Sequence, residues 1–152
     1  MRNIIDEYGR NAGKIWQALN TYGFLSQTNI IRNTKLKNDE FNSAIGWLAR
    51  ENKISIQKTT RGSIYNLGET NLTTKIGKDA GRVWKTLSTL GENDVNDISK
   101  YTRIKPDEVY AALGWLARED KIDVKYGKNQ KMTFGLKNDD GSKIMSKKGK
   151  ML

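Results

Sequence analysis

The stretch IGWLAREN at residues 45–52 recurs as LGWLARED at residues 113–120. Each copy carries a glycine and a tryptophan inside a segment whose apolar spacing predicts a helix. An offset of 68 residues superimposes the two copies, and the match extends outward from them without a gap. Over the segments 8–56 and 76–124, 21 of 49 aligned positions are identical. The 152-residue chain is therefore two copies of one module.

The repeat defines the domain organisation. The first module spans residues 1–68 and the second spans residues 76–136, and the polar segment ETNLTTK at residues 69–75 is suited to a linker. Residues 137–152 contain five lysines and few apolar side chains, so we expect a flexible basic tail there.

Each module shows the pattern of three helices followed by a two-stranded hairpin. Ser26 is a good cap for the second helix, and Gly23 ends the first. In the first module the apolar spacing predicts helices over residues 10–22, 26–33 and 39–51, and strands over residues 54–56 and 64–67. This order is that of a winged helix-turn-helix, so the expected fold class is α+β, mainly helical, with two tandem domains.

The second module repeats these signals with two differences. Asp94 replaces Ser26 as the cap of the second helix, and Pro106 falls in the first turn of the third helix, where its missing N–H costs nothing. The hairpin pairs residues 122–124 with residues 132–136. Its wing needs one extra residue to bring Phe134 into the place of Tyr65.

The motifs GRNAGKIWQAL at residues 9–19 and GKDAGRVWKTL at residues 77–87 are each followed by GWLARE and then KI. Together they resemble a small family of single winged helix-turn-helix domains from bacteria and archaea, whose function is largely unassigned. The resemblance covers nearly all of both modules and implies DNA binding through the fold. The tandem arrangement and the basic tail depart from a single-domain member.

The composition favours a polyanionic partner. The chain has 27 Lys and Arg against 17 Asp and Glu, a net charge of +10. It has no cysteine and no histidine, which excludes disulfides, thiolate metal sites and the commonest general base. No apolar run is long enough to span a membrane. We therefore expect a cytoplasmic protein of the nucleoid without enzymatic activity, cofactor or metal.

The third helix of a helix-turn-helix normally enters the major groove. Opposite its apolar stripe lie Asp39, Ser43, Gly46 and Arg50, and the acidic residues at the helix start disfavour extensive base contacts. Positive charge instead gathers at the turn and the wing, where it suits phosphate contacts. The residues predicted to contact DNA are Arg32, Lys35, Lys37, Ser43, Arg50, Lys58, Arg61, Lys100, Arg103, Lys105, Arg118, Lys125, Lys128 and Lys131.

These observations predict a double-stranded DNA-binding protein that is a transcriptional regulator or a nucleoid-associated protein, with RNA as an alternative partner. The glycine–tryptophan pairs leave a second hypothesis open. Gly46-Trp47 and Gly114-Trp115 either allow tight packing within a module or form an association surface for a helix, the other module or a second chain. The second case would describe a protein-interaction module or a homodimer. Trp16 and Trp84 are expected in the core of the first helices.

Overall fold

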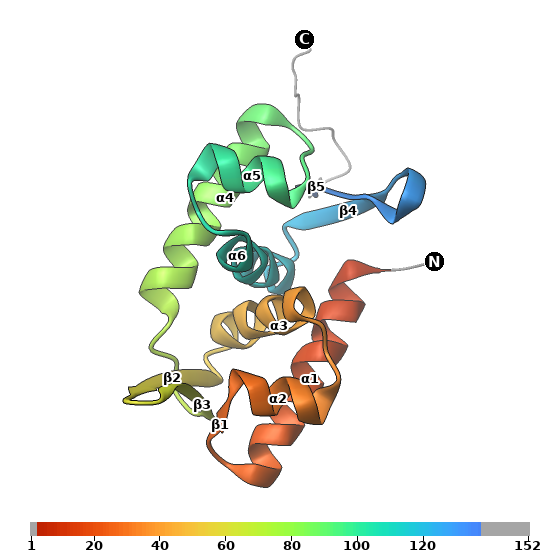
Figure 1. Cartoon of the computed structure of the whole chain (residues 1–152). Helices are drawn as coiled ribbons and strands as arrows, with labels where there is room; N and C mark the ends of the chain where they lie inside the picture. The colour runs from red at the N-terminus through yellow and green to blue at the C-terminus, as the bar shows by residue number, and fades with distance from the viewer. Residues whose placement is uncertain (1–2, 138–152) are drawn as a thin grey trace.

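The structure is a computed structural model and describes residues 3–137 (Figure 1). The predicted tail beyond Lys137 lies outside these residues. The first module contains α1 (Ile4–Tyr22), β1 (Leu25–Ser26), α2 (Gln27–Thr34), α3 (Asn38–Arg50), β2 (Ile54–Thr59) and β3 (Gly62–Leu67). The second contains the helical turn η1 (Thr73–Gly77), α4 (Lys78–Leu90), α5 (Val95–Thr102), α6 (Pro106–Arg118), β4 (Ile122–Tyr126), the short turn η2 (Lys128–Gln130) and β5 (Met132–Leu136). The predicted α+β fold of two tandem winged modules is confirmed.

The two wings have the predicted register. Ile56 lies opposite Tyr65 in the antiparallel β2–β3 pair, and Val124 lies opposite Phe134 in the β4–β5 pair. The additional residue of the second wing is accommodated at the hairpin end, where Asn129 adopts a left-handed backbone with φ of 61°. The short strand β1 joins the other edge of β3. Each module therefore ends in a hairpin, which forms a small sheet beside the third helix.

The predicted helix caps are present. The Ser26 hydroxyl accepts a hydrogen bond from the backbone N–H of Asn29, and the Asp94 carboxylate accepts one from the N–H of Asp97. Both satisfy donors that the first turn of a helix leaves free. Pro106 is the first residue of α6, as predicted.

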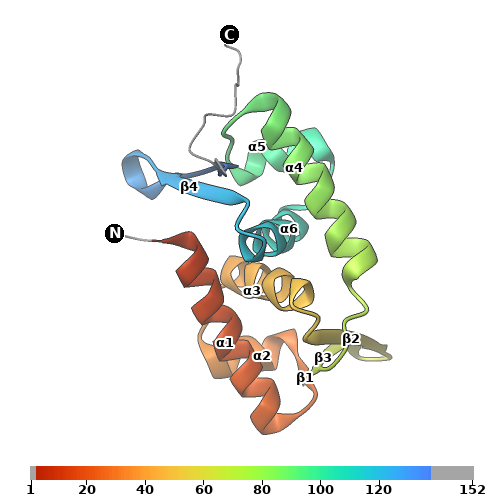
Figure 2. The ribbon, with the colours of Figure 1, turned by 180° about the vertical axis from the view of Figure 1, so that it is seen from behind.

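The two modules share their cores. The third helices α3 and α6 lie against each other in the middle of the molecule, with α1 and α2 beyond α3 and with α4 and α5 beyond α6 (Figures 1 and 2). The buried side chains of Ile4 and Tyr8 at the start of α1 belong to the core of the second module. Ile76, which the repeat aligns with Tyr8, belongs to the core of the first. Each module thus completes the other.

This exchange explains an error in the predicted start of the first helix. The helix begins at Ile4, where the Asn3 side chain caps it, and not at residue 10. The additional turns are stabilised by the buried contacts of Ile4 and Tyr8 with the second module, which a local apolar pattern does not reveal.

The expectation that Trp16 and Trp84 are core residues is wrong. Their exposed fractions are 38% and 42%. Ile15 and Leu19 form the buried centre of the α1 stripe and are 0% and 2% exposed. Because neighbouring residues differ by about 100° around a helix, Trp16 lies at the edge of that stripe and only part of its ring is covered.

The segment predicted as a linker carries structure of its own. The side-chain amide of Asn71 donates to the carbonyl of Ile56 at 2.7 Å, and its oxygen accepts from the N–H of Ile56 at 3.0 Å. The turn η1 follows directly and leads into α4 without a break. The connection is therefore bound to the first wing.

Candidate nucleic-acid interface

The contact between α3 and α6 is built on two glycines. A Cβ atom placed on Gly46 would lie 1.8 Å from the carbonyl oxygen of Ala111, and one on Gly114 would lie 1.8 Å from the carbonyl oxygen of Ser43. Any side chain at either position would therefore collide with the backbone of the other helix. The two helices approach each other this closely because Ser43, Gly46, Ala111 and Gly114 are all small.

The two tryptophans flank this glycine contact. A Cβ atom on Gly9 would lie 3.1 Å from the ring of Trp47, and one on Gly77 would lie 3.2 Å from the ring of Trp115. Both rings also pack against both hydrophobic cores. The residues proposed as an interaction surface, Gly46, Trp47, Gly114 and Trp115, thus lie in the contact between the two modules of one chain.

Charged groups close the carboxyl ends of the two helices. The Arg50 Nε donates to the Glu119 carboxylate at 3.0 Å, and the Arg118 Nε donates to the Glu51 carboxylate at 2.9 Å. The Arg50 guanidinium lies 5.8 Å from the ring centroid of Trp115, and Arg118 has the same relation to Trp47 at 5.7 Å. These arginines are half-exposed, so each pair contributes about 1 kcal/mol at most.

The amino ends of the helices also meet. The side-chain amide of Asn38 donates to the Asp107 carboxylate at 2.9 Å. Like ends of α3 and α6 are therefore on the same side, and a pseudo-twofold relation connects the two modules. In a winged helix-turn-helix this helix surface faces the DNA groove. Here the middle of that surface, at Ser43, Gly46, Ala111 and Gly114, is buried against the other helix, so this part of α3 and α6 is closed to a DNA groove in this arrangement.

This arrangement differs from what we expected for three of the predicted DNA-contacting residues. Ser43 is 1% exposed, and its hydroxyl donates to the Asp39 carbonyl within α3. Arg50 and Arg118 are engaged with carboxylates of the opposite module. A helical-wheel count placed these residues correctly opposite the core stripe, but could not show that a second helix covers that face.

The predicted turn residues are exposed in both modules. Lys35 and Arg103 have left-handed backbones with φ of 63° and 61°, because each ends its second helix and turns the chain toward the third. This turn projects their side chains into solvent. The exposed cations at the two turns are Arg32, Lys35, Lys37, Lys100, Arg103 and Lys105. Arg32 also donates to the side chain of Asn29 at 3.0 Å.

The wings differ in how their cations are paired. Lys58 and Arg61 on the first wing are exposed and have no ion-pair partner among residues 3–137. On the second wing Lys125 pairs with Glu92 at 2.7 Å and Lys131 pairs with Asp94 at 3.4 Å, while Lys128 is exposed. The hydrogen bond from Lys125 to Glu92 raises the pKa of that lysine.

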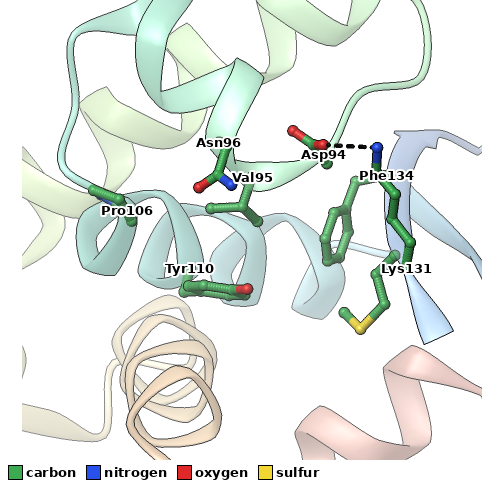
Figure 3. Close-up of a pocket in the computed structure, with 8 residues that line it drawn as sticks. Asp94, Val95, Asn96, Pro106, Tyr110, Lys131 and Phe134 are labelled. Atoms are coloured by element: carbon green, nitrogen blue, oxygen red, sulfur yellow. Dashed lines mark ion pairs between the residues drawn. The ribbon is translucent and has the colours of Figure 1, made fainter. Parts of the chain in front are cut away.

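Beside the second wing lies a pocket that sequence reasoning missed. It has a volume of about 340 Å³ and lies between the start of α5, the α6 helix and β5 (Figure 3). The Asp94–Lys131 ion pair lies on one side, and the ring of Tyr110 forms the floor. Burial raises the pKa of Tyr110. The residues converge from positions 94 to 134, and no sequence motif connects them.

Comparison with protein families gives the same fold for both modules. The model of a family described as winged helix-turn-helix domain (DUF2582) matches residues 1–67 and again residues 71–136. The chain belongs to this family. The double match confirms the predicted resemblance and the tandem duplication. No curated protein and no solved structure gives a significant match.

Membership in this family carries a general functional meaning. Winged helix-turn-helix domains generally serve DNA binding or regulation, and such modules are typically not enzymes. Among residues 3–137 no helix is long and apolar enough to cross a membrane. The same part of the chain has no group of three or more acidic side chains placed to hold a metal ion.

Proposed function

We propose that the protein binds double-stranded DNA through phosphate contacts, as a transcriptional regulator or a nucleoid-associated protein in the cytoplasm. The observation that carries the proposal is the exposure of cations at both turns and on the first wing, together with the burial of both groove-reading helix faces. Phosphate contacts position a protein on DNA without reading its sequence. The binding is therefore expected to be weakly sequence-dependent.

The fused modules give this surface a fixed geometry. Two tethered modules would have to find their phosphates independently, whereas the α3–α6 contact holds the two turns at the same end of the paired helices. A preorganised array of cations loses less conformational freedom on binding. If the six turn cations each met one phosphate, the slope of log K against log salt would be about −5.

The alternative function as a protein-interaction module relied on the glycine–tryptophan faces. These faces bind each other within one chain, so in this arrangement they are not free to take a partner or to form a homodimer. DNA binding therefore has the stronger structural support. A competition between duplex DNA and duplex RNA distinguishes the remaining polyanionic partners.

An anisotropy titration of labelled random duplex at several salt concentrations tests the proposal. Changing Arg61 or Arg103 to Glu should weaken binding to all sequences alike, because each change replaces a phosphate contact with repulsion. Lys85 on the exposed face of α4 is a matched control, since Lys85→Glu alters the net charge equally but lies outside the turn and wing. Absence of binding at micromolar protein in low salt refutes the proposal, and an equal loss with Lys85→Glu refutes the assigned surface.

A further inference from the structure

A second pocket lies where the first wing, the connection η1 and the start of α6 meet. Its volume is about 210 Å³, below the range of about 300–1,000 Å³ typical of sites for drug-sized ligands. Ile45, Ile56 and Ile76 contribute an apolar wall, and these three side chains come from α3, β2 and η1. The pocket is therefore suited to a small ligand with a compact apolar body.

Charged groups line the other side of this pocket. The Asp79 side chain is only 6% exposed, and its carboxylate forms an ion pair with the Lys75 ammonium, with 2.9 Å between Oδ2 and Nζ. Lys75 also reaches the Glu108 carboxylate at 3.2 Å, although its own side chain is 55% exposed. A buried carboxylate is thus paired with the ammonium of a lysine whose side chain is more than half exposed. Asp107 adds a further carboxylate, so acidic groups outnumber the single ammonium in the lining.

The pseudo-twofold repeat shows that the fold does not require this pocket. At the equivalent place in the other half, Tyr8 replaces Ile76 and Tyr110 replaces Asn42. Tyr8 is a buried member of the second core and is 3% exposed, and the partly buried Tyr110 packs against that core. The position of Asp79 is taken there by the neutral Asn11. Smaller side chains and a buried carboxylate therefore occur together in one half only.

We propose that this pocket binds a small organic cation, a primary ammonium group on a short apolar body. The ammonium replaces that of Lys75 at the Asp79 carboxylate, and the apolar body covers Ile45, Ile56 and Ile76. Lys75 then turns out into solvent, which its exposure allows. A charge-assisted hydrogen bond of this kind is stronger than a neutral one, which makes the ammonium the group that decides affinity.

Benzylamine is a suitable probe, with benzyl alcohol as the uncharged comparison of the same shape. The experiment is a titration of the full chain followed by methyl NMR of Ile45, Ile56 and Ile76. Benzylamine should shift these methyl resonances and bind about tenfold or more tightly than benzyl alcohol. Equal affinity for the two compounds, or no shift at millimolar benzylamine, overturns the proposal.

Three variants test the assigned contacts. Asp79→Asn should weaken benzylamine binding about tenfold, with Asp123→Asn on the exposed second wing as the matched control. Asn42→Tyr introduces the residue that the second module carries and should abolish binding by filling the pocket. Lys75→Met removes the competing ammonium and should tighten binding, an effect that a merely structural role of Lys75 would not produce. If Lys75→Met binds benzylamine as tightly as the original chain or more weakly, the proposed displacement of the Lys75 ammonium by the ligand is refuted. This result is decisive even if Asp79→Asn fails to fold.

Discussion

Substitution of Gly46 by alanine gives the sharpest test of the module contact. A glycine in a helix interior costs about 1 kcal/mol relative to alanine, so the local rule predicts that the change stabilises the protein. The structure predicts the opposite sign. The new Cβ atom would lie 1.8 Å from the Ala111 carbonyl oxygen, whereas real Cβ atoms stay at least 3.0 Å from such neighbours. The helices must therefore separate by about 1 Å.

The cost of this separation exceeds the gain in helix propensity. The obstructing atoms are backbone and cannot rotate away, so we assign the upper end of the overpacking range, about 3 kcal/mol. Subtraction of the propensity gain leaves a net loss of about 2 kcal/mol in the free energy of unfolding. At about 2–4 °C per kcal/mol for a chain of this size, Tm should fall by about 4–8 °C.

Gly13 in α1 is the matched control. It is exposed, and a Cβ atom there would meet nothing within 4 Å. Gly13→Ala should therefore raise the free energy of unfolding by about 0.5–1 kcal/mol. Thermal and urea unfolding of the two variants should show shifts of opposite sign. A rise in Tm with Gly46→Ala similar to that with Gly13→Ala would refute the close contact of α3 and α6.

Three further changes test neighbouring features. Trp47→Ala removes a ring that packs on Gly9 and on both cores, so urea unfolding should show a loss of about 2–3 kcal/mol, and a loss below 1 kcal/mol would contradict this packing. Arg50→Glu should lower stability through repulsion with Glu119, and the added change Glu119→Arg should restore about 0.2–1 kcal/mol in a double-mutant cycle, where zero coupling would argue against the ion pair. Burial raises the pKa of Tyr8 above its ordinary value of 10.0, so its contribution to stability is complete below pH 10 and is lost as the pH rises further. Tyr8→Phe should flatten the alkaline side of the stability profile, and an unchanged profile would show that Tyr8 does not titrate with unfolding.

The local features of the fold could be predicted because local rules decide them. The caps at Ser26 and Asp94, the position of Pro106 and the additional residue in the second wing depend on residues that are neighbours in sequence or across a hairpin. Because the two copies show the same pattern, each assignment of a helix or strand in one copy supports the same assignment in the other. The resulting module has the expected order of elements.

The relation between the modules could not be predicted from the same patterns. A helical wheel shows that Ser43 and Gly46 lie opposite the core. However, it does not distinguish whether solvent, DNA or a second helix covers that face. The residue types on this face are a partial indication of a helix contact, because the face has small residues and few cations. Likewise, the early start of α1 depends on Ile4 and Tyr8 reaching a core that is formed more than 70 residues later.

The exchanged helix starts affect what a cut in the chain would produce. A break at Glu69 would separate the two family domains cleanly by sequence. However, the first fragment would leave Ile4 and Tyr8 without their core, and the second would leave Ile76 without its own. Each fragment would thus expose the apolar surface that the other covers, and the two would be complementary halves of one folding unit. In this chain the family's domain therefore does not contain its complete hydrophobic core, because each copy supplies part of the core of the other.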